Sequence, residues 1–349
     1  MMNNELSLQR KPENKTNPLA TTATAMKALA RTKPDPIIEG LLHKGEQLMV
    51  YSAPGAGKSW FALSLAIAAA SATAISEDEQ GRLKWSAAKA RKVLFLDGEL
   101  DSADLGQRLK WLDPEGRAED GKLIILSRQH QDFKAAFPDL SVELDAEDLI
   151  QFCLDHGVEL LVLDNLATLT QLEDENSASA FNTIIHGLLM RLKAVGIACV
   201  LVHHSNKGDG GYRGSSALAT TFNAIIHLKK ERLTRGAFTL NFQKARNNHI
   251  DDKTVRMELR EQVDGSLRLI CDETVSKLEL MAHLVRSREY TMDQELAEAL
   301  ARQLNEEPYL KGTFSKWKKQ CIALQFISRK EWDQCLEDAA ELADDDLEL

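Results

Sequence analysis

The sequence predicts an α/β protein built around a mostly parallel sheet with helices on its faces. Short apolar segments alternate along the chain with helical patterns, as in strand–helix–strand units joined by right-handed crossovers. Four of the apolar segments are continuous runs of Val, Ile and Leu, which is typical of strands buried on both faces of a parallel sheet. A glycine-rich loop joins the first of the expected strands to a helix.

The strands that we expect cover residues 47–51, 92–96, 123–126, 160–163, 198–202, 224–228 and 238–242. The helices that we expect between them cover residues 59–72, 105–112, 146–156 and 178–195. The strands within residues 224–270 have no helix between them. We therefore expect the sheet to continue there as an antiparallel extension.

The 349 residues suffice for one large domain with an appendage, or for two domains. Residues 1–33 are rich in Thr, Ala, Asn and Lys, and we expect a flexible tail with a short helix near residues 23–30. The α/β core is expected to cover residues 34–272. Residues 275–349 are expected to form a small helical or winged-helix-like module with an acidic tail. Its helical patterns cover residues 275–286, 293–304, 311–324 and 329–342.

Composition and charge exclude several classes of protein. The most apolar stretch, residues 60–74, is too short to cross a bilayer core of about 30 Å, and no apolar leader opens the chain. The five cysteines include no Cys-x-x-Cys pair, which excludes a zinc ribbon and favours reduced thiols. We therefore expect a cytoplasmic protein with no membrane partner. The net charge of −10 argues against a protein that coats DNA, but residues 331–349 carry much of it, so a local basic groove is still compatible.

The strongest motif is a phosphate-binding loop between the first expected strand and the first expected helix. Its residues are Ser52, Ala53, Pro54, Gly55, Ala56, Gly57, Lys58 and Ser59, and Trp60 follows in the first turn of the helix. In such a loop, backbone N–H groups cradle phosphate oxygens, the lysine reaches the β- and γ-phosphates, and the serine holds Mg²⁺. Ser52 stands where this motif has a glycine. The sequence predicts a site for ATP and Mg²⁺, with Gly55 and Gly57 supplying backbone freedom.

Two further expected strands end in acidic residues. Residues 160–163 lead to Asp164, and residues 92–96 lead to Asp97 and Glu99. Because ligands bind at the carboxyl ends of strands in open α/β sheets, we expect Asp164 to hold Mg²⁺. Glu99 is our candidate for the base that orients water near the γ-phosphate, and Asp97 is expected to cap the next turn. The alternatives are a capping role for Asp164 and a solvated loop position for Glu99.

A fourth signal follows the strand expected at residues 198–202. His203 and His204 come at its end, and a glycine-rich loop with Lys207 and Arg213 follows. His204, Lys207 and Arg213 could sense a γ-phosphate or contact a nucleic-acid backbone, and we expect Lys207 and Arg213 to bind DNA. A histidine pair alone is more often structural or a metal ligand, but no Cys or Glu at ligand spacing supports a metal here.

A fifth signal is the pair Lys244 and Arg246 at the end of a late strand. Side chains at positions i and i+2 share one face of a strand, so these two cations could clamp phosphate oxygens. A solvated basic strand end explains the pattern equally well.

Together these motifs resemble the RecA-like hexameric ATPases of the DnaB superfamily. They are most similar to the RepA-type replicative helicases of plasmids and mobile elements, which are grouped with the AAA_25 ATPases. The similarity covers about residues 36–250, and the order of the motifs is as informative as any one of them. Residues 1–33 and 275–349 are not covered by it.

The resemblance implies a RecA-like fold and a homo-hexameric ring with ATP at the subunit interfaces and single-stranded DNA in the central channel. It implies replication initiator or loader proteins as further partners. It also implies that Glu99 is the catalytic base and His204 a sensor, and that Arg246, with Lys244, acts on the nucleotide of the neighbouring subunit.

We therefore expect an Mg²⁺-dependent ATPase motor on single-stranded DNA, namely a ring-shaped replicative helicase of a plasmid or mobile element. The alternative is an ATP-switched DNA-binding or strand-pairing scaffold that does not unwind DNA, which slow turnover with filament formation would favour. A P-loop phosphotransferase acting on a small molecule is disfavoured, because no second arginine-rich lid with a small-substrate pocket is apparent.

Overall fold

The structure is a computed structural model, and it places helix α1 (Ala23–Ala28) where a short helix was predicted. It describes residues 22–28, 35–78, 81–118, 121–132, 136–170, 178–205, 220–231, 234–246, 254–272, 277–304, 307, 309–323 and 326–345. The chain divides into two units, Met1–Asp35 and Pro36–Leu349. Helix α1 belongs to the first unit, and all of its side chains are exposed.

The second unit is built on a sheet of eleven strands in the order β5-β4-β13-β12-β11-β10-β3-β9-β8-β6-β7. The six strands from β10 to β7 run parallel to one another, and each was predicted as a strand. They are β3 (Gln47–Ser52), β6 (Val93–Asp97), β7 (Leu123–Ser127), β8 (Leu160–Asp164), β9 (Ala198–His204) and β10 (Ala224–Lys230). The predicted α/β fold with a mostly parallel sheet is confirmed.

The rest of the sheet is largely antiparallel, as predicted. Strands β11 (Ala237–Ala245), β12 (Thr254–Glu261) and β13 (Leu267–Asp272) follow β10 as an antiparallel series. Two strands that were not predicted extend this side, β4 (Ala74–Glu77) in parallel with β13 and β5 (Leu83–Ser86) antiparallel to β4. A separate two-stranded sheet joins β1 (Pro36–Ile38) to β2 (Leu42–His43).

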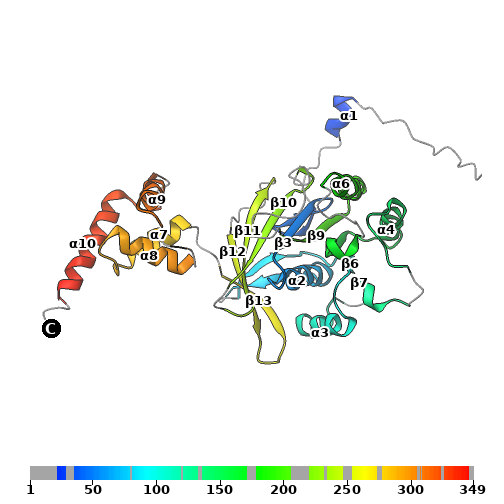
Figure 1. Cartoon of the computed structure of the whole chain (residues 1–349), viewed down its shortest axis with the longest axis horizontal. Helices are drawn as coiled ribbons and strands as arrows, with labels where there is room; N and C mark the ends of the chain where they lie inside the picture. Colours follow the sequence, from blue (N-terminus) through cyan, green and yellow to red (C-terminus); the bar gives the residue numbers. More distant parts are fainter. Residues whose placement is uncertain are drawn as a thin grey trace, which may run out of the picture. The chain divides into compact units, whose positions relative to one another are not determined.

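Helices cover both faces of the parallel strands (Figure 1). Successive side chains of a strand point to opposite faces, so Val50 and Met49 of β3 belong to different apolar clusters. The cluster around Val50 is covered by α2 (Lys58–Ser71) and α3 (Ser102–Leu112). The cluster around Met49 is covered by α4 (Glu143–Asp155), α5 (Leu166–Leu169) and α6 (Ala178–Ala194). These strands consist of continuous apolar runs because both of their faces are buried. A short 3₁₀ helix, η1 (Arg128–His130), follows β7.

The C-terminal residues form four helices that pack around their own apolar cluster. They are α7 (Lys277–Arg286), α8 (Asp293–Leu304), α9 (Lys311–Ala323) and α10 (Arg329–Asp345). Leu300, Phe314 and the fully buried Trp332 belong to that cluster. The described part of residues 277–345 contains no strand, so it is helical rather than winged-helix-like. That residues 275–349 form a module separate from the core stays a prediction.

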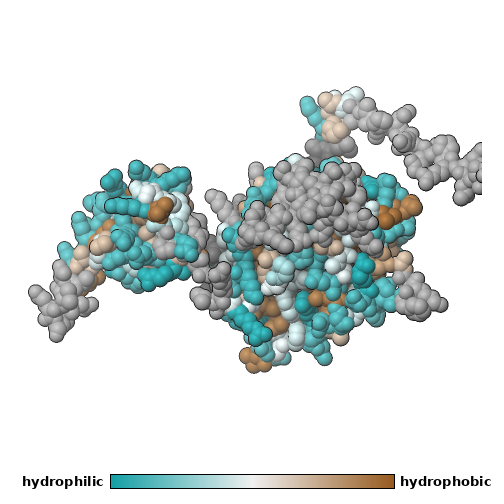
Figure 2. Space-filling model, in the orientation of Figure 1, coloured by the Kyte–Doolittle hydropathy of each residue, from teal (hydrophilic) through white to brown (hydrophobic). Residues whose placement is uncertain are grey.

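Hydrophilic side chains cover most of the surface seen in Figure 2, and apolar side chains are scattered over it. The most exposed large apolar residues, such as Leu83, Leu144 and Val263, come from separate elements or turns. Among the described helices, none combines the length and the apolar character that crossing a membrane requires.

Candidate functional site

A cavity of about 320 Å³ opens at the edge of the sheet where the parallel strands end. Segments that follow β3, β6, β8 and β9 reach it, because the carboxyl ends of parallel strands meet at one edge. Ser52 and Ala53 lie at the end of β3, immediately before the lining residues. The lining includes the predicted residues Pro54, Gly55, Ala56, Gly57, Lys58, Ser59, Trp60, Glu99, Asp164 and His204. Residues assigned from four separate segments are thus brought together.

The serine at the first position of the loop contacts its lysine. Nζ of Lys58 donates hydrogen bonds to Oγ of Ser52 at 3.1 Å and to the carbonyl oxygens of Ser52 and Ala53 at 3.2 and 3.0 Å. Burial lowers the pKa of Lys58, and the carboxylates of Asp164 and Glu99 oppose that effect. The ammonium group therefore lies within the loop, close to the place where phosphate oxygens would enter.

Gly57 is required at the start of α2 for two reasons. Its φ angle is 110°, in the left-handed region that side chains disfavour, and a Cβ atom there would lie 2.9 Å from Cδ1 of Phe238. No side chain caps the helix at this position. The first N–H groups of α2 are therefore available to an anion, which a helix N-terminus attracts.

Asp164, the last residue of β8, is 2% exposed and forms the inner wall of the cavity. Burial raises its pKa to about 7, while a hydrogen bond from the Ser59 hydroxyl and the charge of Lys58 lower it. Oδ2 of Asp164 is buried and has no hydrogen-bond partner among the described residues. An unpaired carboxylate oxygen beside a serine hydroxyl fits the way Mg²⁺ binds, through one or two protein oxygens and substrate phosphates.

Glu99 reaches the cavity from the turn after β6, and it is held there by a residue that the sequence did not single out. Nδ2 of Asn165 donates a short hydrogen bond to Oε2 of Glu99. The two turns approach closely because Gly98 packs against Thr168, where a Cβ atom would clash. The N–H group of Gly98 also donates to the carbonyl of Asp164 at 2.8 Å.

Asp97 points away from this cavity and has the capping role that was predicted. Its carboxylate accepts hydrogen bonds from the N–H group of Leu100 at 3.2 Å and from the hydroxyl of Ser127 at 3.3 Å. The side chain is fully buried, and burial raises its pKa. Of the two acidic residues at the end of β6, Asp97 is therefore buried inside the protein, and Glu99 faces the cavity.

His204 ends β9, directly beside Ser52 in the sheet register, and lines the cavity. Its neighbour His203 is 3% exposed and does not line it. Of the two histidines, the structure therefore places the predicted one next to the phosphate-binding loop. The described residues contain no cluster of His, Cys, Asp and Glu that could hold a metal by protein ligands alone.

Three cations that sequence reasoning missed also line the cavity. Arg108 comes from α3, Lys230 ends β10, and Arg235 lies in the turn before β11. With Lys58 they make four positive charges against the carboxylates of Glu99 and Asp164, a surplus that suits a polyphosphate. In the sequence, only the Lys229-Lys230 pair at the end of an apolar strand indicated that one of these cations lies at this edge of the sheet.

Aromatic side chains form another part of the wall. The guanidinium carbon of Arg108 lies 4.7 Å from the centre of the Trp60 ring, and the rings of Trp60 and Trp111 are 6.3 Å apart. A flat aromatic and guanidinium surface is the type on which a nucleobase stacks.

Lys244 and Arg246 lie outside this cavity, at the other edge of the sheet. Strand β11 runs antiparallel to β10, so its end lies beside the start of the parallel strands. The N–H group of Arg246 donates to Asn223, whose N–H group donates to Gln47 at the beginning of β3. Arg246 is thus level with Gln47, and the phosphate-binding loop starts about 17 Å further along β3. Within one chain these two cations therefore do not reach the phosphate-binding loop, and their action on a neighbour's nucleotide stays a prediction.

The two predicted DNA-binding residues, Lys207 and Arg213, lie outside the described residues. The same holds for the glycine-rich loop that contains them.

The fold and this cavity define a RecA-like P-loop ATPase. The chain belongs to the AAA_25 family, described as an AAA domain, which matches residues 12–210, more than half of the 349 residues. This agrees with the family resemblance inferred from the motifs. No curated protein matches the sequence.

Among the solved structures that match the chain is a KaiC-like protein of the hyperthermophilic archaeon Pyrococcus horikoshii OT3. The two chains share 17% sequence identity with a TM-score of 0.47. The match covers 67% of this chain and 93% of the other.

Proposed function

We propose that the protein is an Mg²⁺-dependent ATPase motor that moves on single-stranded DNA, as a ring-shaped replicative helicase of a plasmid or mobile element. The observation that carries this proposal is the separation of two sets of residues. One chain assembles the phosphate loop, Asp164 and Glu99 in one cavity, while Lys244 and Arg246 lie at the far edge of its sheet. A set completed by a second copy fits a head-to-tail assembly, which closes into a ring in the class of protein that we propose.

Hydrolysis would proceed by in-line attack of water on the γ-phosphate. Lys58 and the N–H groups of the loop bind the phosphates, and Ser59 and Asp164 would hold Mg²⁺, which neutralises phosphate charge. Glu99 orients the attacking water, and Asn165 fixes the position of its carboxylate. His204, beside the loop, is positioned to respond to the γ-phosphate.

Arg246 would act on the nucleotide of the neighbouring subunit. Within its own chain it is too far from the phosphate loop for one side chain to bridge, and it is exposed. Lys244 is close enough to Arg246 for that charge to contribute to its lowered pKa, for which burial is the main cause. Two adjacent cations at an exposed edge suit a phosphate group brought by a second copy, and such a contribution in trans makes hydrolysis depend on assembly.

The DNA part of the proposal rests on the order of motifs and on the basic residues Lys207 and Arg213 that follow β9. The end of β9 carries His204 into the ATP cavity, so the segment that follows begins at the nucleotide. Partners that load the ring would be initiator or loader proteins.

The test combines three measurements on the full chain with ATP and Mg²⁺. Steady-state hydrolysis is compared without DNA, with a single-stranded oligonucleotide and with a duplex of equal length. Negative-stain images show the assembly, and a forked duplex reports unwinding. We expect rings, stimulation by the single strand and strand separation. Glu99→Gln serves as the control that still assembles with ATP but turns over slowly.

Each other result points to a different protein. Filaments with slow hydrolysis that single-stranded DNA does not accelerate would favour the ATP-switched scaffold. Rings whose rate of ATP hydrolysis is the same with and without DNA would contradict the proposed action on DNA but not the proposed ATPase activity. Absence of hydrolysis in the presence of Mg²⁺ and DNA would overturn the proposed chemistry itself.

A further inference from the structure

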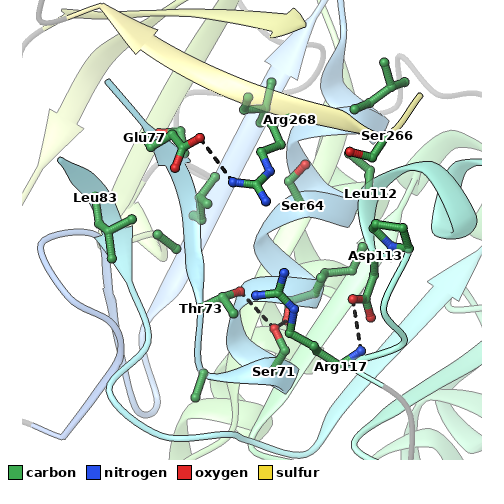
Figure 3. A pocket seen from close by; sticks show the side chains of 18 residues that line it. Ser64, Ser71, Thr73, Glu77, Leu83, Leu112, Asp113, Arg117, Ser266 and Arg268 are labelled. Carbon is green, nitrogen blue, oxygen red and sulfur yellow. Dashed lines mark hydrogen bonds and ion pairs between the residues drawn. The ribbon is translucent and has the colours of Figure 1, made fainter. Parts of the chain in front are cut away.

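A second cavity, of about 310 Å³, lies at the end of α2 that is remote from the phosphate-binding loop (Figure 3). Its walls come from the second half of α2, from β4, from the segment after α3 and from β13. Helix α2 has 14 residues and spans about 21 Å, so the two cavities are attached to opposite ends of one helix. Neither the motifs nor the family assign anything to this place.

Two arginines from different elements extend into this cavity. Figure 3 shows Arg268 of β13 and Arg117, which follows α3, pointing toward one another from opposite sides. Their side chains are 50% and 44% exposed, so solvent and small solutes reach both. Two guanidinium groups that face one shared space form a receptor for an anion with several oxygens.

The carboxylates of Glu77 and Asp113 also line the cavity, but they and Glu115 use only part of this donor capacity. Arg268 donates from one nitrogen to Glu77 at 3.2 Å, and Arg117 pairs through Nε with Glu115 at 3.0 Å. A guanidinium group has five N–H donors, so each arginine keeps several for another acceptor within the described structure. The carboxylate of Asp113 is already used, because it accepts the backbone N–H groups of Arg117 and Ala118.

A buried hydroxyl group in the same cavity has no partner. Ser64 of α2 is 7% exposed and lines the cavity, and its Oγ makes no hydrogen bond to any described residue. A helical serine usually satisfies its hydroxyl on the preceding turn, which Ser64 does not do. Ser76 also lines the cavity, and its Oγ is likewise buried and makes no hydrogen bond to any described residue. Leaving such groups unsatisfied is unfavourable, so a ligand with acceptor atoms would be stabilised here.

We propose that this cavity binds a small phosphomonoester with an apolar or aromatic body. A phosphate monoester has three terminal oxygens, enough to accept from Arg117, from Arg268 and from Ser64 once its buried hydroxyl turns toward the cavity, whereas a carboxylate has two. The wall also contains apolar residues, among them Leu112, Leu267 and Leu83, which would contact the body of the ligand. The combination of charged donors and an apolar wall is typical of small-molecule sites.

Direct binding of phenyl phosphate tests the proposal by isothermal titration calorimetry. The full chain carries Lys58→Ala, which disables the phosphate-binding loop, so the result does not depend on ATP hydrolysis or on DNA. We expect one binding site per chain. Arg117→Gln and Arg268→Gln in this background should each weaken binding about 10- to 100-fold. Orthophosphate should bind more weakly than phenyl phosphate, because it has no apolar body.

The matched control is the pair Arg302→Gln and Arg329→Gln, which removes two exposed positive charges from α8 and α10. It should leave the binding of phenyl phosphate unchanged. No detectable binding at millimolar concentration would overturn the proposal. So would an equal loss in the control, because the arginines would then act only through net charge.

Ser64→Ala gives a second test, because it should weaken ligand binding without lowering the stability of the free protein. Removing an unpaired buried hydroxyl should leave the melting temperature of the free protein unchanged or higher, and should weaken phenyl phosphate binding several-fold. If Ser64→Ala lowers the melting temperature and leaves binding intact, the hydroxyl has a structural partner and does not face the ligand.

Discussion

The side-chain amide of Asn165 donates a hydrogen bond to the carboxylate of Glu99, and this joins the turns after β8 and β6. Asn165 is 1% exposed, and its Oδ1 accepts the N–H group of Thr168 at 3.3 Å, which fixes the orientation of the amide. Glu99 itself is exposed. The position of a solvated carboxylate is therefore set by a buried neighbour.

Asn165→Ala should lower the rate of ATP hydrolysis by up to about 100-fold, because a displaced base orients water poorly. Nucleotide affinity should change less than turnover, since the side-chain amide of Asn165 donates to Glu99 and not to a residue of the phosphate loop. Steady-state turnover and equilibrium binding of a fluorescent ATP analogue measure the two effects. Glu99→Gln is the reference, with the greater loss of turnover. Parental turnover in Asn165→Ala would show that Glu99 needs no such support.

Asp164→Asn should stabilise the protein in the absence of Mg²⁺ and nucleotide while abolishing Mg²⁺-dependent hydrolysis. Burial raises the pKa of Asp164 to about 7, so the folded state holds a proton that the unfolded state releases above about pH 4. The parent therefore loses stability as pH rises from about 4 to about 7 and no further above that, and the amide variant does not. We expect the variant's gain in the free energy of unfolding to be about 2 kcal/mol greater at pH 8.5 than at pH 5.5.

Urea denaturation at the two pH values measures this difference. Asp155→Asn, at the exposed end of α4, is the control that should change neither stability nor hydrolysis. A gain that is the same at both pH values would contradict the role of the buried charge.

The parallel strands were predictable because burial on both faces demands continuous apolar runs. The convergence of Asp164, Glu99 and His204 was predictable for the same reason, since parallel strands end at one edge. Strands β4 and β5 were not, because Ala74–Glu77 and Leu83–Ser86 are four residues each, partly polar and without a clear period. Arg108 and Asn165 enter the cavity through the packing of a helix and a turn, which local pattern does not encode. The edge at which Lys244 and Arg246 lie depends on the direction of β11, which the resemblance left undefined.

Arg246→Ala should bind ATP and hydrolyse it about 10³- to 10⁵-fold more slowly, as expected for loss of an arginine finger. Lys58→Ala should be inactive for a different reason, because it lacks the phosphate-binding lysine. Mixing the two variants should restore part of the activity, since some interfaces then combine an intact loop with an intact Arg246. Arg260→Ala, which removes a half-buried arginine of β12 that pairs with Glu258, is the control and should keep parental turnover.

The mixture is assayed over a range of ratios, with co-assembly verified by a tag on one variant. Co-assembled mixtures without recovery would indicate that Arg246 does not act on the neighbour's nucleotide. Coupled firing around a ring reduces the recovery, so the expected activity lies below that of a statistical mixture.

Lys207→Ala should weaken single-stranded DNA binding by a similar factor for every sequence. One lost phosphate contact lowers the slope of log affinity against log salt by about 0.7. Fluorescence anisotropy of a labelled oligonucleotide at several salt concentrations measures the slope, and Lys193→Ala in α6 is the control. An unchanged slope in Lys207→Ala would place the DNA contacts elsewhere.

Strand β11 carries Phe238 against the phosphate loop at its beginning and leads to Lys244 and Arg246 at its end. Its nine residues span about 30 Å; they pair with β10 along the strand, with one register shift before Lys244, and with β12 over Ala237–Asn241. If Arg246 acts on the neighbour's nucleotide as proposed, strand β11 connects two successive ATP sites in a ring. Motion of Phe238 when one loop fills with phosphate would then shift the cations offered to the next site, which gives the ring a mechanical route for firing in sequence.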